Sequence, residues 1–215
     1  MATLQTAPPR RDGLAAALET DQPRVTARQF QVWWETGRLN EDTPVELLDG
    51  RLVLRDRGMG DGLMADPRQE IAVIELRDSL MRQLAGAPCH VRTEMSAEVG
   101  EFDVPFPDVF VVQGRAKDYR DGPPTAADIL FAAEVANTSL RRDRGSKSVI
   151  YAEGGVSPYL ILDVNGRTGE LRVEPDPATG GYSIAKEFAG SESIKVEICG
   201  RSVTLVLSEL FADEG

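Results

Sequence analysis

The chain has 215 residues, and 24 Lys and Arg against 35 Asp and Glu give it a formal net charge of −11. The apolar fraction of 41% and the charged fraction of 27% are typical of a folded globular protein whose core needs no disulfides. No apolar stretch is long enough to span a membrane, and the start lacks a signal sequence, so we expect a cytoplasmic protein. The acidic charge excludes a general nucleic-acid coating protein, which would be basic.

Histidine and cysteine are scarce, and this excludes several kinds of site. His90 is the single histidine, and Cys89 and Cys199 are the two cysteines. A structural zinc site takes four such ligands, and a disulfide framework needs more cysteines. We expect Cys89 and His90 to be packed and inert. Hydrolytic chemistry would have to rest on carboxylates, lysines and hydroxyls, with a hard cation such as Mg²⁺.

The N-terminal part divides into a tail and the start of a single domain. Residues 1–24 are rich in Ala, Pro, Arg and Thr and predict a partly flexible tail, so the domain spans 25–215. Thr26 is a candidate cap for a helix that continues to Gly37. We interpret Trp33 and Trp34 in this helix as core residues rather than base-stacking ones.

A hairpin, a loop and a long helix are predicted next. Asp49-Gly50 between two apolar runs is a strong hairpin signal for residues 45–54. Three glycines within residues 55–67 indicate a mobile loop. A helix then spans residues 68–84, and its apolar residues predict a core-facing stripe: Ile71, Ile74, Leu80, Met81 and Leu84.

The rest of the chain reads mostly as strands around one further helix. A helix over residues 139–153, between two buried strands, is typical of a crossover unit. The predicted fold is therefore α/β, a restriction-endonuclease-like arrangement with a central mixed sheet flanked by helices. Strands after Val173 are additions with no assigned chemistry. The candidate strands are Cys89–Met95, Val109–Val112, Ile129–Val135, Tyr159–Val164, Leu171–Val173, Tyr182–Phe188 and Lys195–Ile198, with Val203–Leu207 as a last strand or helix lead-in.

Three segments carry charge where an ordinary core would not. Asp108 follows a proline at the mouth of an apolar strand, and Glu134 lies within a strand that reads as buried. A buried carboxylate is costly unless it is paired or bound to a metal. Lys147 lies on the following helix, four residues before Tyr151 and on the same face. The two carboxylates could hold Mg²⁺, and the metal could polarise a phosphate. The lysine could orient or deprotonate a water.

These segments resemble the PD-(D/E)XK nuclease superfamily, and within it the Uma-type (Uma two) family of restriction-endonuclease-like proteins. The similarity covers about Thr26 to Val173, and its five segments occur in the family's order. They are Glu46-Leu47-Leu48-Asp49-Gly50, Pro107-Asp108, Glu134-Val135, Lys147 with Tyr151, and Gly154-Gly155-Val156-Ser157-Pro158-Tyr159-Leu160-Ile161-Leu162-Asp163.

The resemblance implies an endonuclease that hydrolyses phosphodiester bonds of DNA with Mg or Mn. It makes Asp108, Glu134 and the backbone carbonyl of Val135 metal ligands, Lys147 the catalytic lysine and Glu46 a further acidic residue at the site. The chain departs from the family's pattern at two places. Ala136 stands where the superfamily's lysine is common, and no histidine stands near Arg68 at the start of the long helix.

Several alternatives stay open at this point. Glu134 could pair with Arg141 or Arg142, Lys147 could be a solvated helix charge, and Tyr151 could be a core residue. Arg141, Arg142 and Arg144, together with Lys147, are the candidate nucleic-acid-binding patch, and a solvated face is the competing interpretation. Asp143 with Arg142 reads as a polar cluster at the start of the helix.

Two further expectations concern the whole molecule. A catalytically inactive binding or assembly module on the same fold is the alternative to an enzyme, and a regulatory partner is a third, weaker hypothesis. A homodimer follows from the resemblance, because cutting two strands needs two sites. Sheet edges or residues Val203–Phe211 could form its interface.

Overall fold

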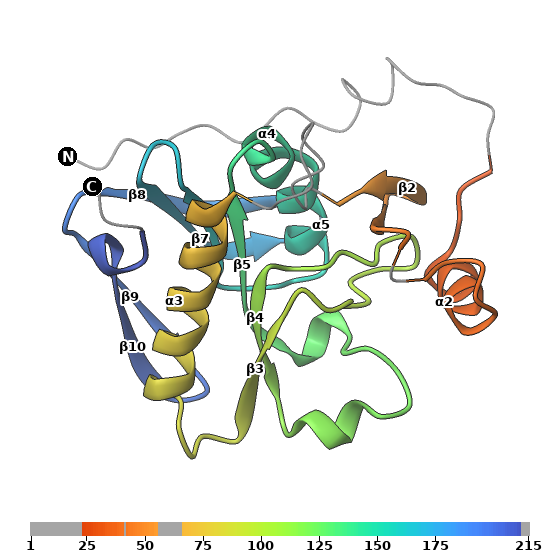
Figure 1. Ribbon diagram of the computed structural model, residues 1–215, viewed down its shortest axis with the longest axis horizontal. Helices are drawn as coiled ribbons and strands as arrows, with labels where there is room; N and C mark the ends of the chain where they lie inside the picture. The colour runs from red at the N-terminus through yellow and green to blue at the C-terminus, as the bar shows by residue number, and fades with distance from the viewer. Residues whose placement is uncertain (1–22, 41, 56–65, 212–215) are drawn as a thin grey trace.

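The computed structural model describes residues 23–40, 42–55 and 66–211 (Figure 1). Most of the predicted tail and of the predicted loop 55–67 lie outside these residues. Within them, no helix is long and apolar enough to cross a membrane. The helices are α2 (Ala27–Glu35), α3 (Pro67–Gln83), α4 (Leu140–Arg142) and α5 (Ser148–Glu153), with short 3₁₀ turns at Ala116–Tyr119, Ala126–Asp128 and Leu207–Glu209.

Ten strands form three sheets among the described residues. The central sheet has six strands in the order β3-β4-β5-β6-β7-β8, and all neighbours are antiparallel except β5 and β6. The predicted mixed sheet is thus confirmed. The strands are β1 (Val45–Leu48), β2 (Arg51–Leu54), β3 (Cys89–Thr93), β4 (Val109–Gln113), β5 (Ile129–Ala136), β6 (Tyr159–Asp163), β7 (Thr168–Asp176), β8 (Gly181–Ala189), β9 (Ser193–Ile198) and β10 (Arg201–Val206).

The predicted N-terminal helix and hairpin are confirmed, although the helix ends at Glu35 rather than at Gly37. Thr26 caps α2 through a reciprocal capping box with Gln29. β1 and β2 pair antiparallel across a two-residue turn, in which Asp49 and Gly50 have φ values of 53° and 72°. Positive φ at both positions is what a type I′ hairpin turn requires, and Asp-Gly meets that requirement at low cost.

Helix α3 buries a stripe that overlaps only in part with the predicted one. Its N-cap is Asp66, whose side chain accepts from the amide of Arg68. Ala72, Leu76 and Leu80 are fully buried, whereas Ile71, Ile74 and Met81 are 38%, 42% and 56% exposed. The prediction was right for Leu80 and Leu84 and wrong for these three residues, because the buried face follows a four-residue repeat that starts at Ala72 and ends at Leu84.

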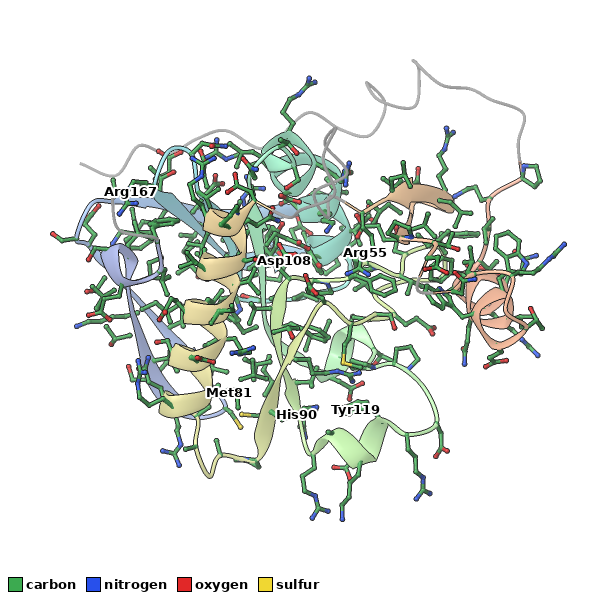
Figure 2. The ribbon with its side chains drawn as sticks, viewed as in Figure 1. Arg55, Met81, His90, Asp108, Tyr119 and Arg167 are labelled. Atoms are coloured by element: carbon green, nitrogen blue, oxygen red, sulfur yellow. The ribbon has the colours of Figure 1, made fainter. Side chains whose placement is uncertain are left out.

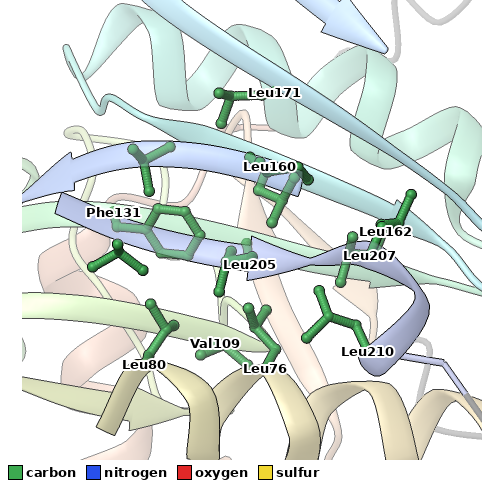
Figure 3. Packing of buried hydrophobic residues seen from close by; sticks show 14 of the residues in the cluster. Leu76, Leu80, Val109, Phe131, Leu160, Leu162, Leu171, Leu205, Leu207 and Leu210 are labelled. Carbon is green, nitrogen blue, oxygen red and sulfur yellow. The ribbon is translucent and has the colours of Figure 1, made fainter. Parts of the chain in front are cut away.

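The central sheet carries a core on each face. On one face, α3 and the β9–β10 hairpin cover the sheet, and Figure 3 shows Leu76, Leu80 and Leu205 beside Phe131 and Leu160. The C-terminal strands are therefore part of the main core. Val203 and Leu205 are fully buried and Phe211 nearly so.

The other face of the sheet holds α5 and the candidate site. A second core joins Phe110 and Ala132 of the sheet to Ile150 and Tyr151 of α5. The segment between β5 and β6 is the predicted crossover, but it is not one regular helix. Asp143–Lys147 forms a π-helical turn between α4 and α5. Such turns are rare and often mark functional positions.

Candidate active site

A small cavity of about 20 Å³ opens where β4 and β5 meet the π-helical turn. That volume holds about one water molecule or ion. The polar side chains around it come from segments far apart in the sequence. They are Glu46, Arg55, Gln69, Asp108, Glu134, Ser139, Arg142, Asp143 and Lys147, with Phe106 beside them.

Strand register brings Asp108 and Glu134 together. Val109 of β4 pairs with Ala133 of β5, so Asp108 lies opposite Glu134, and paired residues project to the same face of a sheet. Pro107 precedes Asp108 and holds the chain extended at this point. The Asp108 Oδ2 atom accepts a 2.7 Å hydrogen bond from the amide of Val135. The two predicted carboxylates are therefore neighbours, one just before β4 and the other within β5.

Lys147 reaches both carboxylates that flank it. Its Nζ lies 3.0 Å from Glu134 Oε1 and 3.1 Å from Glu46 Oε2, and its side chain is only 7% exposed. Burial lowers the pKa of Lys147, but Glu134 and Glu46 outweigh it and raise the pKa above its ordinary value. The raised pKa favours the ammonium form of Lys147, and its burial and two ion pairs contradict the interpretation as a solvated helix charge.

Tyr151 and Glu46 complete this cluster. The Tyr151 hydroxyl donates a 2.8 Å hydrogen bond to Glu134 Oε1, which fixes the orientation of that carboxylate. Glu46, on β1, is 1% exposed and accepts from the amide of Phe106 at 3.3 Å. Neither Arg141 nor Arg142 takes the place of Lys147 as the partner of Glu134.

Asp143 is a site residue whose role the sequence did not reveal. It is 1% exposed, its Oδ2 accepts from the Ser139 hydroxyl at 2.6 Å, and its Oδ1 has no hydrogen-bond partner among the described residues. Tyr159 donates to its backbone carbonyl at 3.0 Å. The four-residue spacing to Lys147 was the available signal, because it places both side chains on one face.

Gln69 stands near the place where the sequence analysis noted a missing histidine. It lies in the first turn of α3, and its Nε2 donates a 2.9 Å hydrogen bond to the carbonyl oxygen of Val135. That carbonyl is the one expected to bind metal. A carbonyl oxygen has two lone pairs, so it can accept from Gln69 and still face a cation.

The structure does not gather the predicted basic patch on one surface. Arg144 is paired with Glu170 at 2.8 Å and with Glu187 at 3.9 Å, on the side of β7 and β8. Arg142 points to the cavity, where it lies 3.7 Å from Glu46 and donates to the carbonyl of Leu54. Arg141 is exposed. Only Arg142 of the three lines the cavity.

The electrostatics of the cavity favour a bound cation. Burial raises the pKa of Asp108 to about 7, although Lys147 and the Val135 amide act against the rise. Burial also raises the pKa values of Glu134 and Asp143, with Lys147 again offsetting part of the effect. Lys147 thus offsets only part of the negative charge of the ionised carboxylates, and Asp143 Oδ1 is a buried acceptor without a hydrogen-bond partner among the described residues.

The donor set fits a hard divalent cation held partly by water or substrate. The residues that the structure describes contain no group of three or more His, Cys, Asp or Glu side chains placed to hold a metal. Mg²⁺ commonly binds one or two carboxylates, several waters and substrate phosphate oxygens. Two carboxylates and a backbone carbonyl match this coordination preference. Asp108, Glu134 and the Val135 carbonyl are the residues that would hold it.

Comparison with known proteins agrees with the class of protein that this fold and cavity define, a nuclease-like α/β domain. The chain belongs to the Uma2 family, described as "Putative restriction endonuclease", whose model matches residues 28–206. A crystal structure of "a putative nuclease belonging to DUF820 from Anabaena variabilis ATCC 29413" shares the fold with a TM-score of 0.62 at 14% identity. The similarity covers 87% of this chain and 97% of that one. No curated protein matches the chain.

Proposed function

We propose that the protein is a metal-dependent endonuclease that hydrolyses phosphodiester bonds of DNA at the cavity between β4, β5 and the π-helical turn. The observation that carries this proposal is the convergence of Asp108, Glu134 and Lys147 around one small buried cavity. Family membership and the shared fold support a nuclease. The metal, the lysine's role and the DNA substrate are inferences from the site.

The chemistry follows from what each group can do. Mg²⁺ or Mn²⁺ bound by Asp108, Glu134 and the Val135 carbonyl would polarise the phosphate and acidify a bound water. Lys147 is held as an ammonium ion, so it donates hydrogen bonds to the attacking water or to a phosphate oxygen and offsets developing negative charge. Of the two roles that the sequence left open for this lysine, orientation is favoured over deprotonation.

A plasmid-nicking assay with Mg²⁺ or Mn²⁺ tests the proposal directly. We expect Lys147→Met and Asp108→Asn to lower the cleavage rate by about 10²–10³-fold, as for loss of one charge-stabilising group. Asp121→Asn is a matched control because its side chain is 86% exposed and far from the cavity lining. Equal loss in the control, or full activity in both site variants, would contradict the assignment.

An inactive module on the same fold is the second candidate. The observation that favours it is the double ion pair of Lys147 with Glu46 and Glu134, which offsets part of their charge without a metal. Calorimetric titration of Mn²⁺ into wild type and Glu134→Gln separates the two. Binding that Glu134→Gln abolishes supports the metal site, whereas heat that is the same in both proteins supports the inactive module.

We also propose a homodimer, because one cavity per chain can cut one strand and a double-strand cut needs two. The exposed edges of the central sheet, at β3 and β8, are the candidate surfaces. Sedimentation equilibrium measures this directly, and a monomer at concentrations that support double-strand cleavage would exclude it.

A further inference from the structure

A much larger groove lies beside the catalytic cavity. Its volume is about 870 Å³, within the range of ligand-binding sites. Helix α2 forms one wall, with Phe30 and Trp34, and the segment between β3 and β4 forms the other, with Met95 and Phe106. Trp34 packs against the N-terminal core cluster, as expected from the sequence for a core residue, but it is only partly buried and also lines the groove. Its ring lies 6.4 Å from those of Phe30 and Phe106.

Two residues join the groove to the catalytic cavity. Arg55 and Phe106 line both. The Arg55 guanidinium stacks 4.3 Å from the centre of the Phe106 ring, and one of its nitrogens donates to the carbonyl of Glu94 at 3.3 Å. Figure 2 shows Arg55 on the α2 side of Asp108. A ligand could therefore extend from the cavity into the groove past a single guanidinium.

The lining of the groove indicates the kind of group that it accepts. Its lining combines the partly buried rings of Trp34 and Phe106 with carboxylates from Asp42, Glu94 and Glu98. Arg55 is the one cationic side chain among the described residues that line it. The carboxylates would repel a phosphate inside the groove but accept hydrogen bonds from amino groups. A flat, neutral ring with N–H donors matches both features, and the base of a nucleotide is such a ring.

We propose that this groove is a subsite for one or two unpaired bases of the substrate strand, with Arg55 contacting the phosphate between the groove and the cavity. The proposal rests on the proposed nuclease function and names its substrate class. In a duplex the base faces are stacked on each other and the edges are paired, so only an unpaired nucleotide can place its base against Trp34. The preferred substrate is therefore single-stranded nucleic acid or a frayed or flipped-out position in a duplex.

Tryptophan emission and fluorescence anisotropy together test the subsite. The chain has two tryptophans, and Trp33 does not line the groove. Trp33→Phe thus leaves Trp34 as the single reporter, and Trp34→Phe is its matched control. The probe is a labelled oligonucleotide of about 12 nucleotides, as a single strand and as a blunt duplex. EDTA prevents cleavage, and binding in the groove needs no metal.

We expect the single strand to quench Trp34 in the Trp33→Phe protein and to leave the emission of the Trp34→Phe protein unchanged. The duplex should bind at least about tenfold more weakly, because stacking is lost. Arg55→Ala should weaken single-strand binding by about tenfold, whereas Arg51→Ala, an exposed arginine of β2 outside both linings, should not.

Three outcomes would overturn the subsite. They are equal affinity for strand and duplex, an anisotropy change without Trp34 quenching, and no binding of either probe. The first two leave the nuclease proposal standing if plasmid nicking still depends on Lys147. Loss of the Lys147 dependence while Trp34 is still quenched would instead contradict the nuclease proposal and keep a single-strand-binding groove.

Discussion

Asp108→Asn should make the metal-free protein more stable at pH 8. Burial raises the pKa of Asp108 from an ordinary value of 3.8 to about 7. At 1.36 kcal/mol per pKa unit, holding the ionised carboxylate in the folded protein costs about 4 kcal/mol above pH 7. An asparagine is nearly the same shape, can accept from the Val135 amide through its carbonyl oxygen, and carries no charge.

The sign of the pH dependence follows from proton binding. A group whose pKa is higher in the folded state holds its proton more tightly there, so it destabilises the fold progressively as pH rises from about 4 through about 7. Between pH 5 and pH 8, this carboxyl alone should therefore reduce wild-type stability by about 2.5 kcal/mol. The advantage of Asp108→Asn should grow by the same amount over that interval.

Urea unfolding in EDTA at pH 5 and pH 8 measures this difference. Asp121→Asn is the control, because an exposed carboxylate should show no such growth. Added Mg²⁺ or Mn²⁺ at 100 times its dissociation constant should stabilise wild type by about 2.7 kcal/mol and Asp108→Asn far less. An advantage that is constant with pH, or an Asp108→Asn protein that is less stable at pH 8, would refute the reasoning.

Three further predictions use matched variants. Gln69→Ala should weaken Mn²⁺ binding, measured by calorimetry, about tenfold, because the Gln69 side-chain amide orients the Val135 carbonyl. An unchanged affinity would show that Gln69 does not support the metal site. Gly154→Ala should lower the free energy of urea unfolding by about 1–3 kcal/mol, because the added Cβ would lie 2.5 Å from the Val99 side chain. Gly145→Ala is the control: nothing lies within 4 Å of its added Cβ, so its stability should be unchanged or slightly higher. Leu76→Ala should cost about 2–5 kcal/mol and Ile74→Ala under about 1, since only the former is buried; similar losses would contradict the observed face of α3.

The elements with strong local signals could be predicted from sequence. Asp49-Gly50 predicted the hairpin because the turn itself selects those residues. Asp108 and Glu134 were identified because charge at the ends and centres of apolar segments is rare. Lys147 was identified from its place on the following helix, on one face with Tyr151, and from the family resemblance. The structure brings all three to one cavity. The exact strand bounds were less accessible, because β7 and β8 lengthen through pairing with each other.

What the sequence could not show depends on tertiary placement. Asp143 read as a polar residue at a helix start, because only the fold reveals that the π-helical turn faces Glu134. Arg144 looked equivalent to Arg142, but Glu170 on β7, far along the chain, holds it away from the cavity. Ile74 fitted a helical stripe as well as Leu76 did, and only the position of the sheet decides between them.

The π-helical turn is a place in the crossover segment where the chain could lose a residue with little effect on the helices that flank it. One residue more than a regular helix needs is accommodated between Asp143 and Lys147. Deleting Gly145 would permit a continuous helix, which is the more favourable local structure. In a regular helix each residue turns about 100° around the axis, so Asp143 and Tyr151 at a seven-residue spacing would lie within about 20° of each other and stay on one face. We therefore expect the deletion to keep the fold and the facing of these two side chains, and to remove only the widened turn beside the cavity. Comparing the unfolding free energy and the cleavage rate of the deletion variant with those of wild type would separate the contribution of the turn from that of the side chains.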